Sequence, residues 1–232
     1  MFNYTIRHYI HDILKNDLFS TEFGRQIERF IESSLVSFGQ KFLTENRIKS
    51  ILPAKYKVVD FYLKENTIFI ECKASDMQPY ASANPQDDLL LNSLKSSLLK
   101  AYFEQLQTVA RLISPDKECW DIIITFKELF WSDFRDLYSI AVGQQDELAE
   151  SIVLLPENVF IIDLYSWNRL LAFAKSARRS LSDILNTVRV ANSSLVTRKL
   201  LFSMHLDELI AGNQVEPLDY LKSELDLLKP QN

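Results

Sequence analysis

Two short apolar runs separated by a polar turn constrain the fold of this chain more than any other feature. Residues 58–62 (Val-Val-Asp-Phe-Tyr) and residues 68–73 (Ile-Phe-Ile-Glu-Cys-Lys) lie on either side of a polar segment of hairpin-loop length. Because side chains alternate between the two faces of a strand, Glu71 and Lys73 share one face of the second run. The pattern predicts a β-hairpin in which Asp60, on the first strand, converges with Glu71 and Lys73.

Two carboxylates on apolar strands repel each other and lose hydration, so burying both without a cation is unfavourable. A divalent cation removes this conflict. Mg²⁺ takes oxygen ligands, usually keeps several waters, and suits one or two carboxylates together with a substrate phosphate. Lys73 can orient or help to deprotonate an attacking water, or neutralise charge on a phosphate in the transition state. The alternative is an ordinary amphipathic hairpin whose charges are solvated.

The spacing Asp60-x10-Glu71-x-Lys73 resembles the PD-(D/E)xK nuclease superfamily of restriction-type, repair and recombination nucleases. Val59 stands where the superfamily pattern has proline, whereas Glu71-Cys72-Lys73 matches its E-x-K form. The resemblance implies an α/β fold with a mixed central sheet flanked by helices, the core of restriction endonuclease-like proteins. It also implies Mg²⁺ as cofactor, with Mn²⁺ able to substitute, Asp60 and Glu71 as metal ligands, and Lys73 as the residue that activates water.

Two helices around the hairpin provide further candidate site residues. The segment 23–32 has an apolar stripe at helical spacing with Glu28 at its border, and Glu32 follows one turn later. The resemblance implies an additional metal-ligating glutamate here, with Glu28 the first candidate and Glu32 the second. In the helix expected at 98–112, Gln105 interrupts a small or apolar face, and the resemblance implies that it positions water or phosphate. Solvated helical glutamates and an exposed or capped glutamine are the alternatives.

The charge of the chain is unevenly distributed. The net charge is −5, yet residues 165–204 carry seven cations and a single acid, Asp183. This segment has a helical pattern, so its cations are expected to form a face that binds backbone phosphates. The alternatives are a solubilising helical surface or a face that docks onto the acidic remainder of the protein. The candidate nucleic-acid-binding residues are Arg178, Arg179, Arg189, Arg198 and Lys199.

The order of the expected elements predicts the architecture. Apolar runs at residues 119–126 and 159–164 read as buried strands, and each follows a helical pattern. Hairpin, helix, strand, helix, strand is an order that produces a mixed sheet flanked by helices. We therefore divide the chain into a nuclease-like α/β core with N-terminal helices, residues 1–165, and a helical C-terminal region, residues 166–232, packed on the core or on a partner.

Composition excludes several classes of protein. Only four glycines are present and no glycine-rich phosphate-binding loop, which argues against nucleotide hydrolysis within this chain. No apolar run approaches the length of a membrane span, and the two cysteines suit reduced core thiols. We expect a cytoplasmic protein with no membrane partner.

The resemblance implies a Mg²⁺-dependent nuclease, and we expect an endonuclease acting on DNA rather than RNA. Restriction, phage defence, mobile-element processing and repair are the settings it suggests. The expected partners are nucleic acid together with a second copy of the chain or an ATPase- or helicase-type subunit. One alternative is a catalytically inactive nucleic-acid-binding or assembly subunit with the same fold. Another is a scaffold that binds only proteins.

Overall fold

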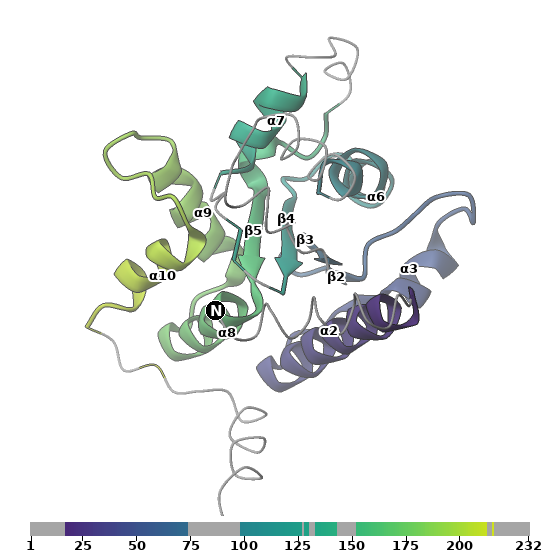
Figure 1. The fold of residues 1–232 in the computed structure, drawn as a ribbon, viewed down its shortest axis with the longest axis horizontal. Coiled ribbons are helices and arrows are strands. Elements are labelled where there is room, and N and C mark those ends of the chain that lie inside the picture. Colours follow the sequence, from purple (N-terminus) through teal and green to yellow (C-terminus); the bar gives the residue numbers. More distant parts are fainter. Residues whose placement is uncertain are drawn as a thin grey trace, which may run out of the picture.

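The computed structural model describes residues 17–73, 98–126, 128–129, 133–142, 152–212 and 215. Within these ranges the chain forms an α/β structure in which a five-stranded mixed sheet lies between helices (Figure 1). The α/β class expected from the order of the elements is therefore confirmed. The strands are β1 (Leu43–Thr44), β2 (Phe61–Leu63), β3 (Ile68–Lys73), β4 (Trp120–Thr125) and β5 (Val159–Asp163).

The sheet has the strand order β1-β2-β3-β4-β5. β2 pairs antiparallel with both β1 and β3, whereas β3, β4 and β5 run parallel to one another. The two buried strands expected at 119–126 and 159–164 are confirmed as β4 and β5. β2 is antiparallel to β3, and therefore also to β4 and β5. The residue that precedes β2 thus lies at the same end of the sheet as the carboxyl ends of β3, β4 and β5.

The first strand of the hairpin is shorter than the alternating pattern predicts. β2 begins at Phe61, so Asp60 lies directly before the strand and not within it. The physical reason is visible at Cys72, whose backbone amide donates to Oδ2 of Asp60 at 2.6 Å. A carboxylate thus binds the amide at the point where the ladder between β2 and β3 ends. The prediction that Asp60 is a strand residue is wrong, although the hairpin itself forms.

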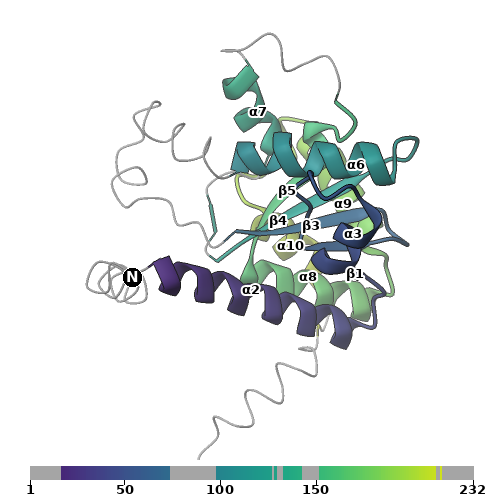
Figure 2. The ribbon, with the colours of Figure 1, turned by 90° about the vertical axis from the view of Figure 1, so that its right-hand side faces the viewer.

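One face of the sheet is covered by two helices, α2 (Asp17–Phe38) and α8 (Leu164–Ala177), which lie side by side (Figure 2). Their apolar side chains join those of the strands in a single buried cluster. A polar link ties the two helices together inside this cluster: the indole Nε1 of Trp167 donates to Oγ of Ser34 at 2.8 Å. Both side chains are fully buried.

Helices on the opposite face bury a second cluster, which includes Phe69, Tyr102 and Phe134. The helix expected at 98–112 is present, but its first part is a π-helix, η2 (Ala101–Leu106), which continues into α6 (Gln107–Ile113). Three further elements surround this face: α3 (Glu45–Ile51), α7 (Phe134–Val142) and the short 3-10 helix η4 (Pro156–Asn158).

The helices of the expected C-terminal region are α8, α9 (Leu181–Asn192) and α10 (Phe202–Ile210). Their apolar side chains belong to the same buried cluster as strands β2 to β5. The expected division at residue 165 falls within α8. Residues 1–16 and 216–232, parts of the two expected regions, lie outside the described residues. Within the described ranges, no helix combines the length and the apolar character that a membrane span requires.

Candidate active site

The candidate residues of the hairpin lie together at the end of the sheet where the parallel strands have their carboxyl ends. Lys73 is the last residue of β3, Glu71 is two residues earlier, and Asp60 precedes β2. In open α/β sheets this end is where ligands bind, because loops and helix ends surround the strand termini there. The topology therefore brings Asp60, Glu71 and Lys73 to one end of the sheet, where Asp60 lines a pocket.

Asp60 is held by its hydrogen bond from the amide of Cys72. Desolvation by burial, followed by the negative charge of Glu71, raises the pKa of Asp60 to about 7. The Cys72 amide and the Lys73 ammonium oppose this rise without cancelling it. Asp60 therefore takes up a proton near neutrality in the absence of a cation, and a cation that bound beside it would displace that proton into solvent.

Glu71 is almost completely buried, with 3% of its surface exposed. Its Oε1 accepts a hydrogen bond from Nζ of Lys73 at 2.6 Å, whereas its Oε2 is buried without a hydrogen-bond partner. Burial raises the pKa of Glu71, and the neighbouring Lys73 opposes that rise. A buried carboxylate oxygen with no partner is unusual in a folded protein and is suited to a ligand that arrives from outside.

Lys73 is placed between two acceptors. Its Nζ contacts Oε1 of Glu71 and, at 3.4 Å, Oε1 of Gln105 on the π-helix η2. Gln105 is itself fixed, because its Nε2 donates to the carbonyl oxygen of Val58 at 3.3 Å. Gln105 thus reaches Lys73 from η2, on the face of the sheet opposite to α2, and lies at the site as predicted from the sequence.

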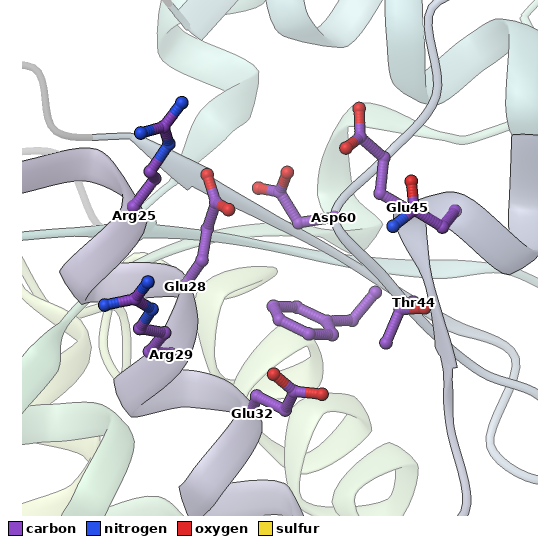
Figure 3. A pocket seen from close by; sticks show the side chains of 9 residues that line it. Arg25, Glu28, Arg29, Glu32, Thr44, Glu45 and Asp60 are labelled. Carbon is purple, nitrogen blue, oxygen red and sulfur yellow. The ribbon is translucent and has the colours of Figure 1, made fainter. Parts of the chain in front are cut away.

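Glu28 projects from α2 into a pocket of about 290 Å³ beside Asp60. Figure 3 shows the carboxylates of Glu28 and Asp60 pointing toward each other across this pocket. Burial, followed by the negative charge of Asp60, raises the pKa of Glu28. Glu32, the second candidate, lines the same pocket but is exposed. The residues that line the pocket are Arg25, Glu28, Arg29, Glu32, Thr44, Glu45, Asn46, Asp60 and Phe61.

Three charged residues that line this pocket, Arg25, Arg29 and Glu45, are not among the candidate site residues predicted from the sequence. Glu45 is the first residue of α3, and its negative charge contributes to the raised pKa values of Asp60 and Glu28. Arg25 and Arg29 flank Glu28 on α2 (Figure 3). The sequence contains a signal for the two arginines, because Arg25, Glu28 and Arg29 are spaced as on one face of a helix. No comparable signal pairs Glu45 with Asp60.

A further acid, Asp121, lies inside the sheet on β4. It is fully buried, and neither carboxylate oxygen has a hydrogen-bond partner. Burial, followed by the charge of Glu71, raises the pKa of Asp121 well above its usual range. The signal that could have found it is a single acid within the apolar run of β4.

The C-terminal cations lie away from the pocket, and several are engaged within the protein. Arg189 pairs with Glu118 and lies over the ring of Trp120, 4.8 Å from its centroid. Arg198 forms an ion pair with Asp136, and Lys199 forms one with Glu208. Arg179 donates a hydrogen bond to the hydroxyl of Thr187. Arg178 is exposed at the end of α8. None of these five cations lines the pocket beside Asp60, and their binding to nucleic acid stays a prediction.

No group of three or more acidic, histidine or cysteine side chains in the described ranges is arranged to hold a metal ion by itself. Mg²⁺ does not require such a group, since it keeps several waters and often binds through one or two carboxylates. The unpartnered Oε2 of Glu71 and the neighbouring carboxylate of Asp60 fit this mode. The donor set is therefore suited to a hard divalent cation that also contacts water and substrate.

In comparisons with known proteins the chain matches no family model, and it shows no significant similarity to a curated protein or to a solved structure.

Proposed function

We propose that this protein is a Mg²⁺-dependent nuclease of the PD-(D/E)xK type that hydrolyses phosphodiester bonds in DNA. The observation that carries the proposal is the meeting of Asp60, Glu71 and Lys73 at one end of the sheet beside an open pocket. The mixed sheet with helices on both faces is compatible with a restriction endonuclease-like core. Fold alone does not define activity, so the proposal depends on the arrangement of these side chains.

The carboxylates have the role of cation ligands in this proposal. Asp60 and Glu71 would hold Mg²⁺, and Glu28 would extend the ligand set from α2. Bound there, the cation would supply positive charge against the scissile phosphate and so stabilise charge in the transition state. Its positive charge would also oppose the two effects that raise the pKa of Asp60, which are burial and, second, the charge of Glu71.

Lys73 and Gln105 have the role of orienting water and phosphate. Nζ of Lys73, held between Glu71 and Gln105, is placed to orient the attacking water and to stabilise negative charge on the phosphate. Hydrolysis forms a bond from the water oxygen to phosphorus and breaks the bond from phosphorus to a sugar oxygen. The water proton is released, and the sugar oxygen takes up a proton, which leaves a phosphate end and a hydroxyl end.

A catalytically inactive nucleic-acid-binding or assembly subunit with the same fold is the second candidate. The observation that favours it is that the described residues contain no metal-binding group that is complete without water or substrate. The position of Glu71 favours catalysis, because its unpartnered oxygen lies on a carboxylate that contacts Lys73 and neighbours Asp60, where a cation would supply the missing partner.

The deciding experiment is cleavage of labelled single- and double-stranded DNA and RNA with Mg²⁺ or Mn²⁺. Wild type is compared with Lys73→Ala and with the control Lys41→Ala, which removes a lysine whose side chain is 90% exposed. We expect metal-dependent cleavage by wild type and the control and none by Lys73→Ala. Equal cleavage by all three proteins would reject the assignment. Mg²⁺ binding without cleavage of any substrate would favour the inactive subunit.

The cellular setting is part of the proposal. A cytoplasmic location and a role in restriction, phage defence, mobile-element processing or repair stay predictions. A second copy of the chain or an ATPase- or helicase-type subunit is the protein partner that we expect for such a role, so cleavage is also assayed at high protein concentration, where self-association is favoured.

A further inference from the structure

We propose that Arg25 and Arg29 of α2 bind two phosphates of the DNA strand that enters the pocket, on the side of Glu28 away from the hairpin. This inference rests on the proposed function, because it assigns the path of the substrate to that same site. The main phosphate contacts are thereby assigned to α2, whose residues line the pocket, and not to the C-terminal cations.

The placement of the two arginines is the first argument. Both line the pocket that contains Asp60 and Glu28, and they are separated by one helical turn, about 6 Å along the axis. In Figure 3 they stand on either side of Glu28 on the same face of α2. A strand whose phosphate lies at Asp60 therefore passes both guanidinium groups, which are suited to phosphate because they present several N–H donors in one plane.

The present partners of the arginines are the second argument. Arg25 and Arg29 contact the same acid, Glu22, at 3.6 Å and 3.8 Å, through side chains that are more than half exposed. Such exposed pairs are weak and are screened by solvent, so a phosphate can replace them at little cost. By contrast, Arg189 and Arg198 pair with acids of the protein while themselves less exposed, at 27% and 31%. Those two cations would have to give up better contacts.

The size and charge of the pocket are the third argument. A volume of about 290 Å³ is that of about ten water molecules, enough for a phosphate and a sugar but not for a base pair. Its acids repel a phosphate unless cations are present beside them. Mg²⁺ at Asp60 and Glu71 neutralises one side of the pocket, and Arg25 and Arg29 neutralise the other.

The test measures binding of single-stranded and duplex DNA in EDTA across a range of salt concentrations, where no cleavage occurs. Each phosphate contact contributes about 0.9 to the slope of log K against log salt for duplex DNA and about 0.7 for single strands. For Arg25→Gln/Arg29→Gln we expect the slope to fall by about 1.8 with duplex or about 1.4 with single strands. Raising salt fourfold would then weaken wild type about tenfold more than it weakens the variant.

Two further variants act as controls. Lys64→Gln/Lys117→Gln removes the same charge from exposed positions outside the pocket and should keep the wild-type slope. Arg25→Lys/Arg29→Lys keeps the charge and should keep most of the slope, which would show that the effect is electrostatic.

The outcomes separate the inference from the proposed function. A wild-type slope in Arg25→Gln/Arg29→Gln, or an equal fall in Lys64→Gln/Lys117→Gln, overturns the inference. The same holds if wild type binds no DNA at any salt concentration. Metal-dependent cleavage by wild type with an unchanged slope rejects the phosphate contacts and leaves the nuclease standing. A reduced slope without cleavage by wild type under any metal condition supports the contacts and rejects the nuclease.

Discussion

The backbone amide of Cys72 donates a hydrogen bond to the carboxylate of Asp60 at 2.6 Å, at the point where the ladder between β2 and β3 ends. One side chain thus does two things: it binds an amide that the neighbouring strand leaves without a backbone partner, and it directs an acid toward the pocket. This contact favours the charged form of Asp60, but desolvation and Glu71 outweigh it, so the pKa still rises to about 7.

We expect the stability of the metal-free protein to fall as the pH rises from about 5 to about 8. The folded protein holds a proton on Asp60 up to about pH 7, whereas the unfolded chain releases it near 3.8. The folded state therefore binds more protons in this window, and Asp60 by itself lowers the free energy of unfolding by up to about 1.4 kcal/mol for each unit that the pH rises. Urea unfolding in EDTA at several pH values measures this slope.

Asp60→Asn should make this pH dependence shallower, because the amide oxygen still accepts from Cys72 but carries no titrating proton. Part of the dependence should remain, because the pKa values of Glu28, Glu71 and Asp121 are also raised. The variant should be more stable than wild type at about pH 8 in EDTA. Asp116→Asn, at an exposed position, is the matched control and should keep the wild-type slope. An increase in wild-type stability across the window would contradict the prediction.

Mg²⁺ should stabilise the protein at about pH 8 and much less at about pH 5, since the carboxylates must lose their protons to bind it. At a concentration one hundredfold above its dissociation constant, the ion would add about 2.7 kcal/mol. Thermal unfolding with and without MgCl₂, together with titration calorimetry, measures the effect. Asp60→Asn and Glu71→Gln should lose the stabilisation, whereas Asp116→Asn should retain it. A shift of equal size in all four proteins would indicate a cation effect unrelated to the site.

Gln105→Leu should lower kcat about tenfold with little change in KM, as expected when a group acts mainly in the transition state. Lys73 loses its second acceptor, and the carbonyl of Val58 loses its donor. The fold should lose only about 1 kcal/mol. Glu104→Gln, on the exposed side of the same helix, is the control and should cleave at the wild-type rate. Normal kcat in Gln105→Leu would show that Lys73 needs no second contact.

Ser34→Ala should destabilise the protein by about 1–3 kcal/mol, because it leaves the indole N–H of Trp167 buried without an acceptor. Trp167→Phe removes the donor as well, so the double variant should lose less than the sum of the two single changes. Urea unfolding of the four proteins gives the coupling energy. Strict additivity would mean that the hydrogen bond contributes nothing to the docking of α2 against α8.

The elements that the sequence predicts well are those whose pattern is local. Strands β3, β4 and β5 are apolar runs, and the alternation in β3 places Glu71 and Lys73 on one face in advance of any structure. The boundary of β2 is not local, because it depends on a contact between Asp60 and Cys72 across the hairpin. A propensity pattern contains no information about that contact.

The candidate site shows the same division. Asp60, Glu71 and Lys73 follow from spacing within one hairpin, and Gln105 from a polar residue on an otherwise apolar helix face. Glu45 reaches the pocket only because β1 pairs with β2 and turns directly into α3, a tertiary arrangement without a signal in the sequence. The uneven charge predicts that the C-terminal cations form a phosphate-binding face. A count of charges cannot distinguish cations that line a pocket from cations that are paired with acids elsewhere in the protein.

The π-helix that carries Gln105 makes the site sensitive to the length of the chain as well as to its residues. The amide of Gln107 bonds to the carbonyl of Tyr102, five residues back, where an α-helix would use the fourth. Deleting one residue of η2 would restore α-helical spacing and rotate Gln105 by about 100° relative to the residues on the far side of the deletion. During evolution, the loss of one codon for another residue of η2 would therefore separate Gln105 from Lys73, although every candidate site residue would still be present in the sequence.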